Sequence, residues 1–184
     1  MKKILCTLVL AMVAMVGFSQ ARMDVRLGMS ITNLTKSDMD AKVGYTLGLG
    51  VDLPVAPSFS VQSGLMFTGK GAKLGDLKVT PTYLDIPILA AYKMAVADDV
   101  NIVINAGPYI GIGLGGKYKI GDTKLDYFGD DRARRFDLGL QYGLGAEFGD
   151  HILLNLSGQY GFISPFEDSD EKNLGFLLTL GYRF

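Results

Sequence analysis

The sequence predicts an all-β fold, an eight-stranded antiparallel up-and-down β-barrel that spans a membrane. Eight segments alternate apolar residues with small or polar ones, which is the pattern of a strand with two different faces. The connections between them are alternately long and short, as in barrels that carry tight turns at one end and loops at the other. The non-apolar faces are rich in glycine and poor in charge, which suits a narrow packed lumen.

The N-terminal residues have the features of a secretory signal peptide. Two lysines precede the apolar stretch Ile4–Val16, and Ser19 and Ala21 supply small residues at the −3 and −1 positions of a cleavage site. We therefore expect residues 1–21 to be a cleaved signal peptide and residues 22–184 to form the barrel domain. An uncleaved anchor helix is the alternative, although the apolar stretch is short for a span.

The first three predicted strands are Met23–Ile31, Val43–Leu53 and Phe59–Thr68. In the first two, every odd-numbered residue is apolar, and glycine dominates the opposite face of the second. The third keeps the alternation with one exception on each face. Pro54–Pro57 forms the short turn before it, because proline lacks the amide hydrogen that a strand interior needs.

Thr82–Met94 and Asn101–Gly115 form the next predicted pair, joined by the turn Ala95–Asp99. Both strands place apolar residues at even-numbered positions. Pro87 removes one donor from the hydrogen-bond ladder, so we expect a bulge or local distortion there.

The last three predicted strands are Phe136–Phe148, His151–Phe162 and Asn173–Phe184, again apolar at even-numbered positions. Gly149 and Asp150 form a tight turn. Because backbone groups in hydrocarbon must all be paired, the first strand is expected to pair with the last and close the sheet. Both termini then lie at the end with the short turns, which is expected to be periplasmic, with the long loops extracellular.

The distribution of charge decides which face points outward. A soluble lipocalin-like barrel would need an outer surface with about a quarter to a third charged residues, and neither face provides it. Aromatic residues also gather near both ends of the strands, as two membrane girdles do. They are Phe59, Tyr92, Phe148 and Phe184 toward the short turns, and Tyr45, Phe67, Phe136 and Phe162 toward the long loops. The net charge of −1 gives no support for nucleic-acid binding.

The faces that point into the lumen carry a small set of charges of both signs. We expect a paired internal network that compensates buried charges; an ion or proton path is the alternative. The residues are Asp24, Arg26, Asp52, Asp85, Lys93, Asp137, Glu147 and Arg183.

Several stretches resemble the outer-membrane β-barrel domain family that includes the PorT-like proteins. They are Val25–Leu34 (VRLGMSITNL), Val61–Lys73 (VQSGLMFTGKGAK), Tyr83–Leu89 (YLDIPIL), Ala106–Gly111 (AGPYIG), Phe136–Gly145 (FDLGLQYGLG) and Leu180–Phe184 (LGYRF). The resemblance implies an outer-membrane barrel of about this size in a Gram-negative bacterium. It brings no catalytic residue and no cofactor with it.

The basic residues of the long loops are the candidate ligand contacts. They are expected either to bind phosphates of lipopolysaccharide in the outer leaflet or simply to face solvent beside nearby aspartates. They are Lys70, Lys73, Lys78, Arg132, Arg134 and Arg135.

Other motifs point to no chemistry. Glycines in Gly111–Gly116 fit alternate lumen positions better than a dinucleotide loop. His151, the sole histidine, lies at a short turn away from where a lipid hydrolase would act. The acidic run Glu167–Glu171 fits no EF-hand spacing. We therefore predict neither catalysis nor a metal or cofactor site.

The function predicted from the sequence is a non-enzymatic structural or interaction module of the outer membrane with a filled lumen and four surface loops. A small-solute channel or an accessory barrel of a secretion or uptake complex is the first alternative, and an outer-membrane lipid hydrolase is the second. Expected partners are outer-membrane lipids, lipopolysaccharide and, through the strand that ends at Phe184, the barrel-assembly machinery.

Overall fold

The computed structural model describes residues 21–35, 40–74, 77–120, 123–128, 134–165 and 171–184. The expected signal peptide lies outside these residues except for Ala21. Within the described ranges, the chain has no helix that could span a membrane.

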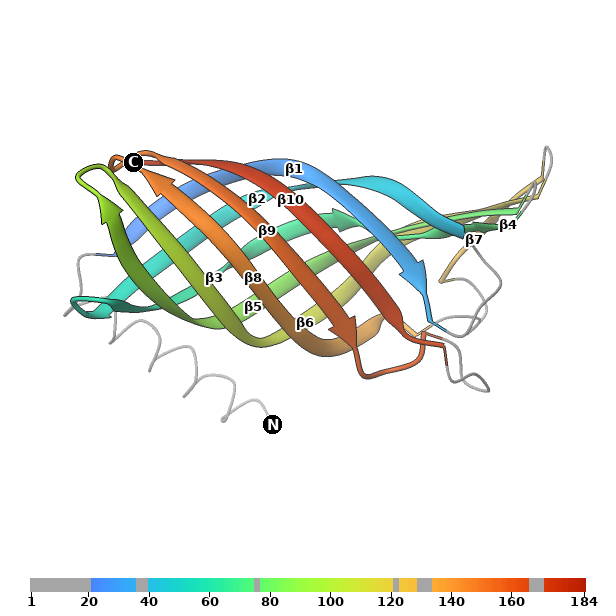
Figure 1. Ribbon diagram of the computed structural model, residues 1–184. Coiled ribbons are helices and arrows are strands. Elements are labelled where there is room, and N and C mark those ends of the chain that lie inside the picture. Colours follow the sequence, from blue (N-terminus) through green and yellow to red (C-terminus); the bar gives the residue numbers. More distant parts are fainter. Residues whose placement is uncertain (1–20, 36–39, 75–76, 121–122, 129–133, 166–170) are drawn as a thin grey trace.

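Eight long strands form the predicted barrel (Figure 1). Each is antiparallel to its neighbours, and β1 pairs with β10 from Asp24↔Arg183 to Leu34↔Asn173, which closes the sheet. The eight strands match the predicted segments in number, order and alternation. They are β1 (Arg22–Leu34), β2 (Asp40–Ala56), β3 (Phe59–Gly69), β5 (Leu77–Ala97), β6 (Val100–Ile120), β8 (Phe136–Phe148), β9 (Ile152–Gly161) and β10 (Asn173–Arg183).

The two faces of the sheet are arranged as predicted, with apolar side chains outside and polar side chains inside. Leu27 and Leu180 are 67% and 58% exposed on the outer surface, whereas Asp24 and Thr46 are 1% and 0% exposed in the lumen. This is the reverse of a soluble protein and the arrangement expected of a barrel whose outer surface meets lipid.

The end of the barrel that carries the turns between β2 and β3, β5 and β6, and β8 and β9 is called here the short-turn end. The chain begins β1 and ends β10 at this end (Figure 1). Gly149 adopts a φ of 56° in the β8–β9 turn, a conformation that glycine adopts without steric cost. The opposite end is called the long-loop end.

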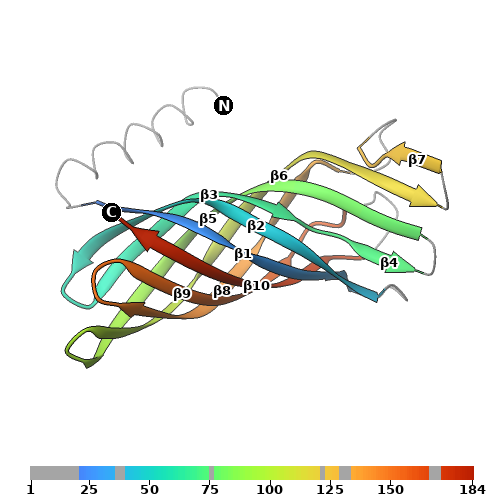
Figure 2. The ribbon, with the colours of Figure 1, turned by 90° about the horizontal axis from the view of Figure 1, so that it is seen from above.

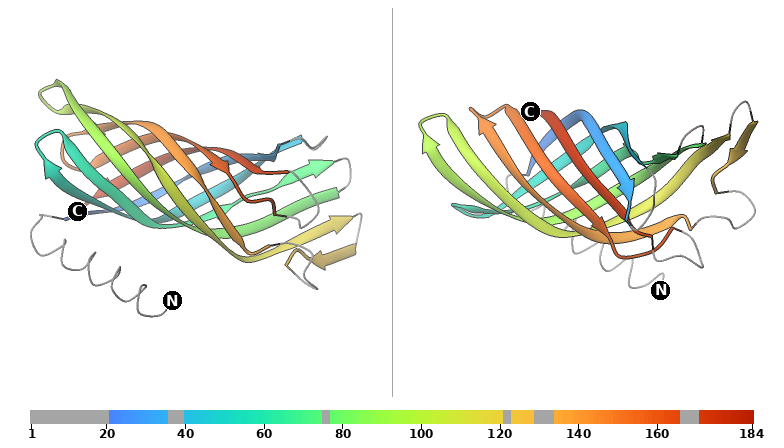
Figure 3. Two further views of the ribbon diagram at one scale, coloured as in Figure 1. Left: turned by 90° about the horizontal axis from the view of Figure 1, so that it is seen from below. Right: turned by 45° about the vertical axis from the view of Figure 1, so that its right-hand side comes forward.

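An arm that the sequence did not predict projects from the long-loop end. The strands β5 and β6 continue past the barrel rim, and the short strands β4 (Ala72–Leu74) and β7 (Thr123–Asp126) pair with them. Figures 2 and 3 show this arm leaving the barrel on the side of β5 and β6. A register shift between Thr82 and Tyr83 marks the point where β5 and β6 leave the barrel.

Pro87 lies at a local interruption of the ladders, one of the two expected outcomes, and not at a bulge. Ile86 and Pro87 have no partner on β3, and Ile88 and Leu89 have none on β6. The pairs Ile86↔Ile110 and Ala90↔Ala106, on either side of Pro87, belong to the same register. The Ser63 hydroxyl donates to the Pro87 carbonyl oxygen at 2.8 Å. This hydrogen bond joins Pro87 to β3 without the extra residue that a bulge would insert. The register shifts of the sheet lie elsewhere, between Pro54 and Ala56, between Thr82 and Tyr83, and between Ala95 and Ala97.

Candidate functional site

The candidate functional site is the lumen, which is filled by three layers of side chains. The layer at the short-turn end is ionic. The Lys93 ammonium donates to Asp52 Oδ2 at 2.6 Å and to Glu147 Oε1 at 2.9 Å. The Arg183 guanidinium donates to both oxygens of Glu147, at 2.7 and 3.2 Å. Two cations and two carboxylates from four strands therefore compensate one another inside the barrel.

A second ionic pair completes this layer on β1. Arg26 donates from Nε and Nη2 to the two oxygens of Asp24, at 2.5 and 3.0 Å. The pair occupies the space above Gly50 of the neighbouring strand, where a Cβ atom would overlap the Asp24 carboxylate. Glycine on the lumen face thus makes room for the charged side chains that fill it.

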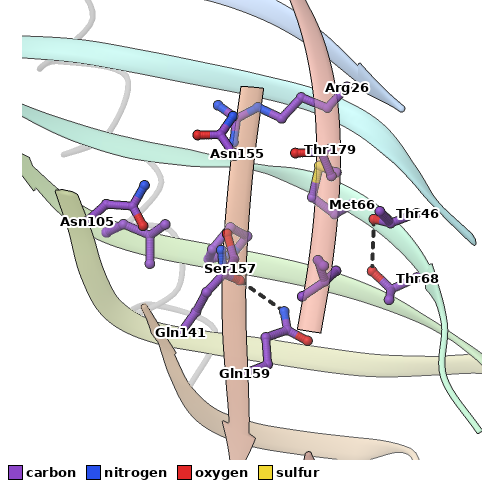
Figure 4. A pocket seen from close by; sticks show the side chains of 13 residues that line it. Arg26, Thr46, Met66, Thr68, Asn105, Gln141, Asn155, Ser157, Gln159 and Thr179 are labelled. Atoms are coloured by element: carbon purple, nitrogen blue, oxygen red, sulfur yellow. Dashed lines mark hydrogen bonds between the residues drawn. The ribbon is translucent and has the colours of Figure 1, made fainter. Parts of the chain in front are cut away.

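The middle layer is mostly neutral, and Figure 4 shows the side chains that line the small cavity left in it. Asn105 Nδ2 donates to Gln62 Oε1 at 3.1 Å. Gln159 Nε2 donates to Gln141 Oε1 at 2.9 Å. Met66 and Leu177 are buried beside these amides. The remaining cavity has a volume of about 30 Å³, enough for about two water molecules. This layer has no room for a solute.

The layer at the long-loop end surrounds the ammonium of Lys70. Lys70 Nζ lies 2.9 Å from Asp85 Oδ1 and 3.4 Å from Asp137 Oδ2. It also lies 4.9 Å from the ring centre of Tyr83 and 4.7 Å from that of Tyr109. We call these four surrounding residues the ammonium cage.

The place of Lys70 corrects one sequence expectation. Lys70 was expected among the surface contacts for lipopolysaccharide, but its side chain is only 3% exposed and points into the lumen. Inward positions of β3 are even-numbered and include Met66 and Thr68. Lys70 continues that alternation one step past the end of the strand, which is the signal that sequence reasoning missed.

A plug of two aromatic residues covers this layer from the loop side. Tyr127 and Phe128 are 2% and 9% exposed, and the Phe128 ring meets Tyr83 edge to face at 5.8 Å. The Arg135 guanidinium lies 4.9 Å from the centre of the Phe128 ring and donates to the Gly113 carbonyl oxygen at 3.3 Å. The plug was not predicted, because it belongs to a segment that the sequence indicated only as a long loop.

The other basic candidates that the structure describes lie at the long-loop end or in the arm. Arg134 and Arg135 are exposed. Lys73 and Lys78 are opposite each other in the β4–β5 ladder. The side chains of Lys73 and Lys78, and all of Arg132, lie outside the described residues.

His151 lies at the short-turn end, as predicted. Its Nδ1 is 2.9 Å from the backbone carbonyl oxygen of Arg183, and its ring stacks on Tyr182 at 5.4 Å with an interplanar angle of 11°. Of the acidic run Glu167–Glu171, only Glu171 lies within the described residues. Among the residues that the structure describes, no group of three or more metal-binding side chains comes together.

Comparisons with known proteins agree with this architecture. The family described as "Outer membrane protein beta-barrel domain" matches residues 13–167. The sequence has no significant match among curated proteins.

Solved structures of similar fold include three outer-membrane barrels. Ail, the attachment invasion locus protein of Yersinia pestis, has a TM-score of 0.53 at 16% identity, covering 90% of this chain and 99% of Ail. Neisserial surface protein A has a TM-score of 0.59 at 11% identity, covering 89% of this chain and 95% of that protein. The outer membrane enzyme PagL has a TM-score of 0.55 at 14% identity, covering 85% and 97%. At these identities the likeness concerns the fold.

Proposed function

This chain belongs to the outer membrane protein β-barrel domain family, and we propose that it is a closed, non-enzymatic barrel that presents its long-loop end as an interaction surface. The observation that carries the proposal is the filling of the lumen. Two ionic layers and one amide layer cross the barrel, and the Tyr127–Phe128 plug covers the end that bears the arm.

The energetic cost of opening such a lumen supports a barrel that does not conduct. A passing ion would have to separate pairs such as Arg183–Glu147 or Lys70–Asp85, which are buried and hydrogen-bonded. Breaking a buried ion pair by removing one partner costs about 3–5 kcal/mol. The side chains that fill the lumen therefore favour a structural or interaction role over a solute channel.

The proposed orientation places both termini in the periplasm and the arm outside the cell. In that orientation Arg134, an exposed residue, lies where phosphates of lipopolysaccharide are found, and β10 offers the barrel-assembly machinery a terminal strand. Charge reversal in Arg134→Glu is expected to weaken lipopolysaccharide binding by the purified barrel. Asp150→Lys, a charge change on the exposed β8–β9 turn, is the matched control and should leave binding unchanged.

Conductance across a planar bilayer tests the closed lumen directly. The wild-type barrel is expected to show no steady current. Phe128→Ala, which removes one of the two rings of the plug, should remain silent because the amide layer and the short-turn layer still block the path. Stepwise, steady openings of the wild-type barrel would overturn the proposal in favour of a solute channel.

A further inference from the structure

The ammonium cage is more elaborate than the pairing of one lysine requires. We propose that it is a binding site for a primary ammonium ion, filled in this structure by the chain's own Lys70. When the Lys70 side chain is removed, the cage should accept a small primary alkylammonium ion from solution. This inference concerns ligand binding and does not depend on whether the barrel conducts.

The walls of the cage belong to strands that do not carry Lys70. Tyr83 and Asp85 lie on β5, Tyr109 on β6 and Asp137 on β8, whereas Lys70 follows the last residue of β3. These walls form the site, and Lys70 enters it as a side chain from a neighbouring segment.

Three of the four walls also make hydrogen bonds that do not involve Lys70. The Tyr109 hydroxyl donates to Asp137 Oδ2 at 2.9 Å, and Asn173 Nδ2 donates to the same oxygen at 3.0 Å. Gln159 Nε2 lies within hydrogen-bonding distance of Asp85 Oδ2, at 3.4 Å. Asp85, Asp137 and Tyr109 therefore each keep a hydrogen-bond partner when the lysine side chain is removed, which favours the preorganisation that a binding site needs.

The chemistry of the cage selects an ammonium ion. Two aromatic rings within about 5 Å of the nitrogen attract a cation, as in aromatic cages that bind ammonium groups. Two carboxylates accept its N–H groups, so a primary ammonium fits better than a quaternary one, which has no N–H to donate. In addition, Asp137 Oδ1 is buried and has no hydrogen-bond partner among the described residues. The cage thus has acceptor capacity that Lys70 does not use.

Lys93 provides an internal contrast. It also bridges two carboxylates, Asp52 and Glu147, at similar distances. Among the described side chains, however, no aromatic ring lies over its ammonium, and Arg183 already pairs with Glu147. Removal of the Lys93 side chain therefore leaves Glu147 paired with Arg183 and Asp52 at 3.9 Å from the same guanidinium, with no aromatic walls, so we expect no binding site for a free ammonium there.

The experiment is rescue of Lys70→Ala by n-propylammonium. This ion carries the three carbons and the nitrogen that the substitution removes. The variant, Lys93→Ala and the wild type are refolded in detergent, and Tm is measured with and without about 100 mM of the ion, because a ligand that binds the folded state raises Tm in a concentration-dependent way. Propan-1-ol, of similar shape without charge, and tetramethylammonium, a cation without N–H groups, are the ligand controls.

The proposal expects n-propylammonium to raise the Tm of Lys70→Ala and to restore at least half of what the substitution lost. The same ion should leave the wild type and Lys93→Ala unchanged, and the two ligand controls should have no effect on any of the three. Equal stabilisation of Lys70→Ala by propan-1-ol, or of Lys93→Ala by n-propylammonium, would show that the cage has no specific affinity. If Lys70→Ala does not refold even with the ion while Lys93→Ala does, the cage does not accept a free ammonium and the proposal is wrong.

Discussion

The ring of Phe128 lies against the backbone of Gly113, in the space that a Cβ atom at position 113 would occupy. The contact joins the plug to the wall of the barrel at the point where β6 leaves it for the arm. Because the Phe128 ring also meets Tyr83 of the ammonium cage edge to face, the fit at Gly113 affects how the cage is covered.

The first prediction concerns this contact. Gly113→Ala should displace Phe128 and lower the unfolding free energy in detergent by about 1–3 kcal/mol, the usual cost of overpacking. Gly115→Ala is the matched control, because a Cβ atom there meets nothing within 4 Å. Denaturant titration of the refolded barrels measures both, and equal stability of the two variants would argue against a seated plug.

The second prediction concerns the ionic layer at the short-turn end. Glu147→Ala leaves Lys93 and Arg183 without the carboxylate that they share, so it should destabilise the barrel by about 3–5 kcal/mol. Asp150→Asn, on the exposed turn two residues beyond β8, should change the stability by less than about 0.5 kcal/mol. Comparable small effects for both substitutions would mean that the Glu147 network contributes little.

The third prediction tests which face meets lipid. Leu140 lies within β8 and points outward, 41% exposed. Leu140→Arg should reduce insertion into bilayers, at a cost of about 2–4 kcal/mol near the midplane. Val55→Arg, at the short-turn end, should cost only about 0–1 kcal/mol because it lies near the interface. Folding yield in lipid vesicles distinguishes them, and normal insertion of Leu140→Arg would reverse the assignment of the two faces.

The fourth prediction concerns hydrolysis of lipids. The Nδ1 atom of His151 lies next to a backbone carbonyl oxygen, and its ring stacks on Tyr182, a residue at the same short-turn end. We expect purified protein to release no fatty acid from lipopolysaccharide or phospholipid, and His151→Ala to behave identically. Turnover that disappears in His151→Ala would instead identify the barrel as a lipid hydrolase.

The barrel itself was predictable because one physical rule determines it. Side chains alternate between lipid and lumen, so each strand can be recognised in the sequence by its alternation of apolar and polar residues. Asp24, Asp52 and Glu147 could therefore be assigned to the lumen by counting positions along their strands. The arm was not predicted, because the predicted strands begin at Thr82, directly after Pro81, and end at Gly115, whereas β5 and β6 continue past these residues. In the structure Pro81 lies opposite Gly116 and its carbonyl oxygen accepts a hydrogen bond from the Lys70 amide.

The plug was beyond sequence reasoning for a different reason. An alternation pattern does not predict where a loop folds back, so nothing in the sequence indicated that Tyr127 and Phe128 cover the lumen. Lys70 falls between these cases. The alternation of β3 points the Lys70 side chain inward, but the predicted strand ends at Thr68, so the alternation was not extended to residue 70.

The pairing of β1 with β10 joins the first part of the barrel to the last. Asp24 can pair with Arg183 in the β1–β10 ladder only when the last residues of the chain are available. Contacts between such distant positions form slowly, because a large loop must close first. Until then each incomplete sheet has exposed edges that invite pairing with other chains. A polypeptide of this design therefore keeps open sheet edges until β10 is available, and the barrel can close only when its last strand pairs with its first.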